Sequence, residues 1–223
     1  MSSFFPETVN VVGNSSVLLD RNYGQQIDKN FTIRFNNPPL EYDEIIHFGN
    51  RLDWLWTGNP RIMGEEAIRK ALGSNGKVLN VGKPSRRFNR IIVKRLRKDG
   101  LVIDLPCEVK STCQLNLKNS PFSSGCTNGS NGFLALHYLD YLKVKNVNIF
   151  GFTFYKGAKG VFFPDEEFEP DRPLSLVSVA EHHARKTAMK RHLNKKGVPT
   201  HDWYNEKKIV MNMVKKNNWR FYE

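Results

Sequence analysis

The sequence predicts an α/β layered fold in which helices flank a mostly parallel β-sheet. Two observations indicate it. Short apolar runs with the length of buried strands alternate along the chain with longer runs whose apolar residues recur at helical spacing. Polar, glycine-containing segments follow several of these short runs, as is typical where a parallel strand ends. The chain has 223 residues, which suits one domain over residues 1–223 with a small lid-like loop region.

Five runs are predicted as strands because they are short and apolar, or alternate between apolar and polar residues. Residues 8–13 end in Gly and are followed by Asn-Ser, and residues 31–35 are followed by two asparagines and two prolines. The other three predicted strands are residues 44–48, 77–81 and 145–150.

Five segments are predicted as helices. Residues 88–98 have their apolar side chains on one helical face and end at Asp-Gly, and residues 132–142 are strongly apolar. The others are residues 65–72, 178–193 and 205–215. Between them, residues 107–130 are rich in Ser, Asn and Gly and predict a loop, while the irregular residues 156–177 predict a lid.

The composition indicates the cellular location of the protein more clearly than its function. The net charge of +12 favours anionic partners such as nucleic acid, an anionic membrane or a charged donor, without choosing among them. Cys107, Cys113 and Cys126 match neither a disulfide framework nor a zinc motif, so free thiols in a reducing compartment are expected. No stretch approaches a membrane span, and the first residues do not resemble a signal peptide. We therefore expect a cytoplasmic location without an anchor.

Three polar strand ends predict a ligand site, because ligands of parallel α/β sheets bind outside the carboxyl ends of the strands. They are Gly13-Asn14-Ser15, Asn36-Asn37 and residues 151–155. Glycine permits close backbone approach, and an asparagine amide can hold a ribose or a phosphate. Neither a dinucleotide fingerprint nor a P-loop is present. Ordinary turn chemistry is the alternative at each of these positions.

Two further segments are candidates for catalysis. Ser130-Asn131-Gly132 precede an apolar helix, where free backbone N–H groups could bind a phosphate or carboxylate, and where Ser130 could equally act as a helix cap. His182 and His183 could supply a general base or a donor to a leaving phosphate, and a surface histidine pair is the alternative. No DxD or other ligand cluster is visible, so no metal site is expected.

These segments together resemble the sialylmotifs of sialyltransferases of the bacterial or viral type. Residues 11–37 resemble the large sialylmotif, and residues 132–151 resemble the small one, ending in Gly-Phe. Gly151-Phe152-Thr153-Phe154-Tyr155 resembles a corresponding segment of bacterial sialyltransferases, and His182 or His183 stands where the family has its late histidine. Within the large motif the resemblance rests on Gly13-Asn14, on Gly24-Gln25-Gln26-Ile27-Asp28 and on Arg34-Phe35-Asn36.

The resemblance implies a Rossmann-like fold and a transferase that uses a CMP-sugar without a metal or other cofactor. It assigns Gly13, Asn14, Ser15 and Asn36 to the CMP moiety. Residues Ser130, Asn131 and Gly132 would face the nucleotide and the donor's carboxylate, Tyr155 the phosphate, and His182 or His183 would be the base. The sequence departs from the family in having Asn131 within the small motif and in lacking the cysteines that join the motifs in animal enzymes.

The expected activity is the transfer of sialic acid or a related nonulosonic acid from a CMP-sugar to a glycan acceptor, with inversion. Two alternatives remain open. The basic charge would suit a glycosyltransferase that acts on nucleic acid such as modified viral DNA, although no DNA-binding motif supports it. The altered small motif would also fit a non-catalytic sugar- or nucleotide-binding module. Release of CMP from a CMP-sugar separates the two enzymes from the module.

Overall fold

The computed structural model describes the sheet, the helices that cover it and the candidate ligand-binding edge. The described residues are 6–15, 18, 20–36, 38, 45–57, 64–80, 87–119, 129–152 and 203–222. The predicted lid over residues 156–177 and the predicted helix over residues 178–193 lie outside them.

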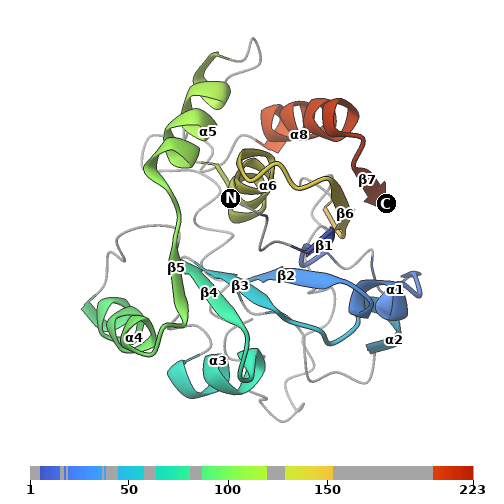
Figure 1. Cartoon of the computed structure of the whole chain (residues 1–223). Coiled ribbons are helices and arrows are strands. Elements are labelled where there is room, and N and C mark those ends of the chain that lie inside the picture. The colour runs from blue at the N-terminus through green and yellow to red at the C-terminus, as the bar shows by residue number, and fades with distance from the viewer. Residues whose placement is uncertain are drawn as a thin grey trace, which may run out of the picture.

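A single seven-stranded sheet forms the centre of the described part of the chain, and all of its strand pairs are parallel (Figure 1). The strand order is β5-β4-β3-β2-β1-β6-β7. The α/β fold class predicted from the sequence is therefore confirmed. The strands are β1 (Thr8–Val12), β2 (Phe31–Phe35), β3 (Trp54–Thr57), β4 (Lys77–Asn80), β5 (Val102–Asp104), β6 (Asn146–Phe150) and β7 (Arg220–Tyr222).

The strand order reverses at β1, and this reversal positions the site. From β1 the chain adds β2 to β5 on one side, and then returns to place β6 on the other side of β1. The register pairs Val12 with Phe150, so the two strands end at the same level. Connections that leave neighbouring strands toward opposite faces open a crevice at such a point, and this crevice is the usual ligand site of doubly wound sheets.

Helices cover both faces of the sheet. One face is covered by α5 (Cys107–Asn119), α6 (Asn131–Tyr141) and α8 (Trp203–Asn217), which share one apolar core with the sheet. On the other face, α1 (Gly24–Asp28) and α2 (Ile45–Phe48) pack near β1 and β6, while α3 (Glu65–Leu72) and α4 (Arg87–Lys98) pack near β3 to β5. Figure 1 shows these two groups of helices on opposite sides of the strands.

Period-2 alternation in β1 explains how the sheet serves both cores. Val9 and Val11 belong to the core under α6, whereas Val12 belongs to the core under α1. Asn10 points with Val12 and is fully buried, but its amide is satisfied. Its Nδ2 donates to the carbonyl of Ile27 at 2.7 Å, and its Oδ1 accepts from Nδ2 of Asn148 at 2.9 Å. This buried pair ties β1, β6 and α1 together.

Two predictions about secondary structure were wrong. Residues 44–48 were expected as a strand, but Ile45–Phe48 form the short helix α2, with Ile46 57% exposed. The helix is favoured by tertiary contacts. Gly24 has no side chain to block the carbonyls of Ile45 and Ile46, and Gly49, at φ +63°, ends the turn by donating to the Ile45 carbonyl at 2.7 Å.

The second error concerns residues 107–130, which were expected as a loop but begin with α5. The buried residues of α5 are Val109, Cys113 and Leu117, which are spaced four apart, so the helix packs against the core along a single narrow stripe. The Ser, Thr and Asn residues between them hid this period. The strands β3, β5 and β7 and the helix α1 were not predicted at all. The remaining predicted elements that fall within the described residues are confirmed to within about two residues.

Within the described residues, no helix is long and apolar enough to cross a membrane. Cys107 is exposed and Cys113 is buried, and both are free thiols. Cys126 lies outside the described residues.

Candidate functional site

The end of β1 touches the end of β6 at Gly13. The N–H of Gly13 donates to the carbonyl of Phe150 at 2.8 Å. A Cβ atom at Gly13 would overlap the carbonyl of Gly151, which itself has φ +66°. Only glycine therefore allows the two strand ends to approach so closely, and the two loops that follow begin side by side.

Asn14 and Asn36 lie next to each other after adjacent strands. The Nδ2 of Asn14 donates to the carbonyl of Phe35 at 3.0 Å, which fixes the orientation of its amide and leaves Oδ1 as an acceptor. Asn36 has φ +55°, a left-handed conformation that asparagine tolerates better than other residues with a side chain. Its N–H donates to the carbonyl of Trp56 at 3.0 Å, which holds the turn against β3.

Asn131 brings the start of α6 to the same place. Its Nδ2 donates to Oδ1 of Asn36 at 3.0 Å, although the two residues are 95 positions apart. Asn14, Asn36 and Asn131 thus form a cluster of three side-chain amides at the strand-order reversal. The cluster combines donors and acceptors at fixed orientations, which is what recognition of ribose hydroxyls and phosphate oxygens requires.

Ser130 caps α6, so the alternative interpretation of this residue is confirmed. Its Oγ accepts from the N–H of Phe133 at 3.3 Å. Its own N–H and hydroxyl both donate to the carboxylate of Glu206, at 2.9 Å and 2.6 Å. Ser130 therefore supports the turn, and the first-turn N–H groups of Asn131 and Gly132 remain as the donors that no helical carbonyl can satisfy.

Glu206 was not predicted as part of the site. It lies on α8, is fully buried, and contacts Ser130 across 76 residues of sequence. The signal that could have found it is a lone acidic residue in the buried stripe of a predicted helix, because a buried carboxylate needs donors. Its charge also contributes, after burial itself, to raising the pKa of the nearby Cys113 thiol.

Phe152 closes one side of the cluster. A Cβ atom at Gly132 would overlap its ring, so Gly132 allows the ring to lie directly on the start of α6. The ring also packs edge-on against Phe35, with centroids 5.9 Å apart. Ser15, the remaining predicted residue of this loop, is buried and its carbonyl accepts from Leu18 at 3.3 Å. Ser15 therefore shapes the loop from inside.

Arg34 lies on the face of the sheet opposite to the core under α6. It is 1% exposed, and it donates to the carbonyls of Phe48 at 2.6 Å and Arg51 at 2.8 Å. Burial lowers the pKa of its guanidinium to about 10, partly offset by the charge of Asp28. Asp28 in turn accepts from the N–H of Arg51 at 2.8 Å. These two residues of the large motif hold the chain after α2 against β2.

The predicted residues Tyr155, His182 and His183 lie outside the described residues. Two of the six histidines are described. His47 contacts the carbonyl of Arg21 at 2.9 Å on α2, and His137 is buried within α6 with its pKa lowered to about 4, mainly by burial. Neither imidazole belongs to the asparagine cluster. Among the described residues, no group of three or more His, Cys, Asp or Glu could hold a metal ion.

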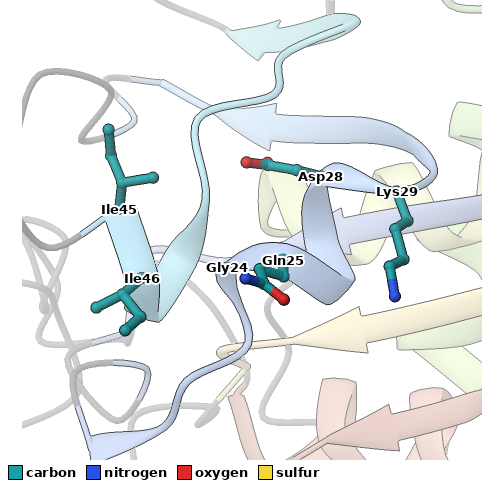
Figure 2. A pocket seen from close by; sticks show the side chains of 6 residues that line it. All are labelled: Gly24, Gln25, Asp28, Lys29, Ile45 and Ile46. Carbon is teal, nitrogen blue, oxygen red and sulfur yellow. The ribbon is translucent and has the colours of Figure 1, made fainter.

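A hollow of about 540 Å³ lies away from the cluster, between α1 and α2 (Figure 2). Gly24, Gln25, Asp28 and Lys29 line one side, and the exposed Ile45 and Ile46 line the other. The Asp28 carboxylate is already engaged by the N–H groups of Asn50 and Arg51. None of the residues that line the hollow is a predicted site residue.

Part of the sequence matches a known protein family. Residues 7–71 match the model of glycosyltransferase family 29, the sialyltransferases. The matched stretch contains Asn14, Asp28, Arg34 and Asn36. No curated protein matches the sequence.

Solved sialyltransferases have the same fold. A mammalian sialyltransferase in complex with Gal-β-1,3-GalNAc-ortho-nitrophenol is 17% identical, with a TM-score of 0.61, over 96% of this chain and 68% of that one. A second mammalian sialyltransferase structure is 18% identical, with a TM-score of 0.62 and the same coverage. The monofunctional α-2,3-sialyltransferase Cst-I from Campylobacter jejuni is 13% identical, with a TM-score of 0.54, over 100% of this chain and 77% of that one.

The resemblance to sialyltransferases that the sequence indicated is confirmed by the family match over residues 7–71, and the shared fold extends over nearly the whole chain. The chain therefore has the fold of solved sialyltransferases, and its residues 7–71 are similar in sequence to their family.

Proposed function

We propose that this chain is a glycosyltransferase, which transfers sialic acid or a related nonulosonic acid from a CMP-sugar to a hydroxyl of a glycan, with inversion at the anomeric carbon. The observation that carries the proposal is the amide cluster of Asn14, Asn36 and Asn131 beside the first turn of α6. It lies at the strand-order reversal, where doubly wound sheets bind nucleotides.

In this proposal the cluster binds the CMP half of the donor. The Oδ1 of Asn14 accepts from a ribose hydroxyl, because the bond from Nδ2 to the Phe35 carbonyl already fixes the orientation of the amide. The N–H groups of Asn131 and Gly132 meet an anionic group, either the donor's phosphate or its carboxylate, with the positive end of the α6 dipole behind them. Glu206 keeps this turn in place through Ser130.

The proposed chemistry is one displacement. The acceptor hydroxyl gives its proton to a histidine as its oxygen bonds to the anomeric carbon. The bond from that carbon to the phosphate oxygen breaks, and its electron pair leaves with CMP as a phosphate monoester. N–H groups at the start of α6, together with Tyr155, stabilise the charge on the leaving phosphate. A phosphate monoester of this kind can leave without a metal or another cofactor, so transfer is expected to continue in the presence of a chelator.

The base is proposed to be His182 or His183. His137 is buried and His47 lies on α2, so neither described histidine competes for the role. Replacing the proposed pair, His182→Ala with His183→Ala, should reduce turnover by about 10²–10⁴-fold while CMP binding is kept. His192→Ala and His201→Ala are the matched controls. Full turnover in the double variant, or the same loss in one control, would place the base elsewhere.

The acceptor is tested directly. One of the similar structures is a complex with a Gal-β-1,3-GalNAc compound and another is an α-2,3-sialyltransferase, so a Gal-β-1,3-GalNAc glycan is the first acceptor to offer with CMP-sialic acid. Release of CMP together with a heavier glycan in the mass spectrum is the expected result. Label appearing on duplex DNA and not on glycan would overturn the glycan acceptor and favour a nucleic-acid glycosyltransferase. Absence of CMP release from every CMP-sugar would favour a binding module.

A further inference from the structure

Half of the residues between positions 83 and 98 are basic. This stretch contains eight Lys or Arg residues and no Asp or Glu. Helix α4 (Arg87–Lys98) forms most of it, and Figure 1 shows α4 at the periphery beside α3 and β5. Basic residues are thus denser here than in the chain as a whole, where 34 of 223 residues are Lys or Arg.

One side of α4 is buried. Ile92, Val93 and Leu96 are at most 4% exposed, and Ile92 and Leu96 belong to the core between α3, α4 and the sheet. The orientation of α4 about its axis is therefore fixed by packing.

The opposite side of α4 is a basic row with an isoleucine in it. Successive helical residues point about 100° apart, so Arg90, Ile91, Lys94 and Lys98 lie on the side away from the buried stripe. All four are exposed, and Ile91 is 39% exposed. We call these four residues the outer row of α4.

Ion pairs flank the outer row but do not reach it. On one flank Arg95 pairs with Glu65 of α3 at 3.2 Å, and on the other Arg97 pairs with Asp104 of β5 at 2.8 Å. Within the described part of the chain, no ion pair involves Arg90, Lys94 or Lys98. The acids near α4 therefore neutralise its flanks, and the positive charge remaining on α4 points outward.

We propose that the outer row of α4 is a docking surface for an anionic lipid bilayer. Basic side chains on the polar side of an amphipathic helix attract the headgroups of anionic lipids. The three cations span nine residues, and the eight steps between the first and the last cover about 12 Å along a straight helix, so they can contact a flat surface together.

Ile91 favours a bilayer over nucleic acid as the partner. An exposed isoleucine among cations gains by entering the boundary between headgroups and acyl chains, whereas a phosphate backbone offers it nothing comparable. None of the four outer-row positions carries an aromatic residue that could stack on bases. The docking surface shares no residue with the asparagine cluster, and α4 and α6 cover opposite faces of the sheet. Docking therefore leaves donor binding free.

The test uses the full chain and vesicles of phosphatidylcholine, with and without about 30% phosphatidylserine. We expect binding only with phosphatidylserine, weakening as salt shortens the range of the attraction. The variant Arg90→Gln, Lys94→Gln, Lys98→Gln should bind about a hundredfold more weakly, since each surface cation contributes roughly a factor of five. The matched control, Lys118→Gln, Lys145→Gln, Lys215→Gln, loses the same charge elsewhere and should bind within about threefold of wild type.

Several results would overturn the proposal. They are wild-type binding that is equal with and without phosphatidylserine, no binding to either vesicle, an equal loss in both triple variants, or a loss confined to duplex DNA binding. Ile91→Ser should weaken vesicle binding without changing DNA binding, and an unchanged vesicle affinity would also contradict the proposal. CMP binding in solution should stay at the wild-type level in every variant, which separates this inference from the proposed transfer activity.

Discussion

The contact between Ser130 and Glu206 makes a strong prediction, because it joins a buried charge to the first turn of α6. Ser130→Ala removes two hydrogen bonds that involve the hydroxyl. The capping bond to Phe133 contributes about 1 kcal/mol. The 2.6 Å bond to the Glu206 carboxylate contributes about 1.5–3 kcal/mol, because the charged oxygen is left buried with one donor fewer. The expected loss of unfolding free energy is therefore about 2.5–4 kcal/mol.

Urea denaturation followed by tryptophan fluorescence measures this loss. Ser111→Ala, an exposed serine of α5, is the control and should change stability by less than about 0.5 kcal/mol. A double-mutant cycle with Glu206→Gln should give a coupling energy of at least about 1 kcal/mol, because Gln lacks the negative charge that accepts the hydrogen bond from the Ser130 hydroxyl. Effects that simply add, or a Ser130→Ala loss no larger than that of Ser111→Ala, would refute this account of the α6 turn.

Three other perturbations have defined outcomes. Gly13→Ala should destabilise the protein more than Gly132→Ala, because the Cβ at position 13 meets a backbone carbonyl, whereas the Cβ at position 132 meets the ring of Phe152, which can turn. Equal urea midpoints for the two variants would contradict the close approach of β1 and β6. Burial lowers the pKa of His137 from 6.5 to about 4, so the imidazole is neutral in the folded protein. Its contribution to the free energy of unfolding is therefore complete above about pH 6.5 and is lost as pH falls toward 4. Wild type should therefore lose about 2 kcal/mol more than His137→Met between about pH 7.5 and pH 5, and parallel pH profiles would show that burial of the neutral imidazole is misassigned. Chelator should leave transfer unchanged, whereas loss of activity that manganese or magnesium restores would indicate a metal-assisted enzyme.

The strand ends at the carboxyl edge are predicted well from the sequence, because local patterns and topology agree there. Short apolar runs ending in Gly13-Asn14 and Asn36 mark strand ends, and parallel strands bring such ends to one edge. This inference needed only periodicity and the direction of each strand. The contact between Asn131 and Asn36 was not predicted, because it joins segments 95 positions apart in the sequence.

The features that the sequence did not predict depend on contacts between distant segments. Glu206 acquires its role only because α8 packs beside α6, and nothing local to it indicates Ser130 as its partner. Ile45 and Ile46 read as a strand because they are apolar, yet tertiary contacts with α1 form a helix there and leave Ile46 exposed. The tryptophans of β3 were missed because a run of four residues is too short to show a period.

Calorimetric titration of CMP tests the central claim, that the asparagine cluster binds the nucleotide of a CMP-sugar donor. Asn14→Ala and Asn36→Gly should each weaken CMP binding at least about tenfold, or roughly 1.4 kcal/mol. Glycine is chosen at position 36 because it keeps the left-handed backbone and removes only the amide. Asn218→Gly, at an exposed asparagine with φ +56°, is the matched control and should bind CMP as wild type does. CMP affinity unchanged in both site variants would contradict the claim.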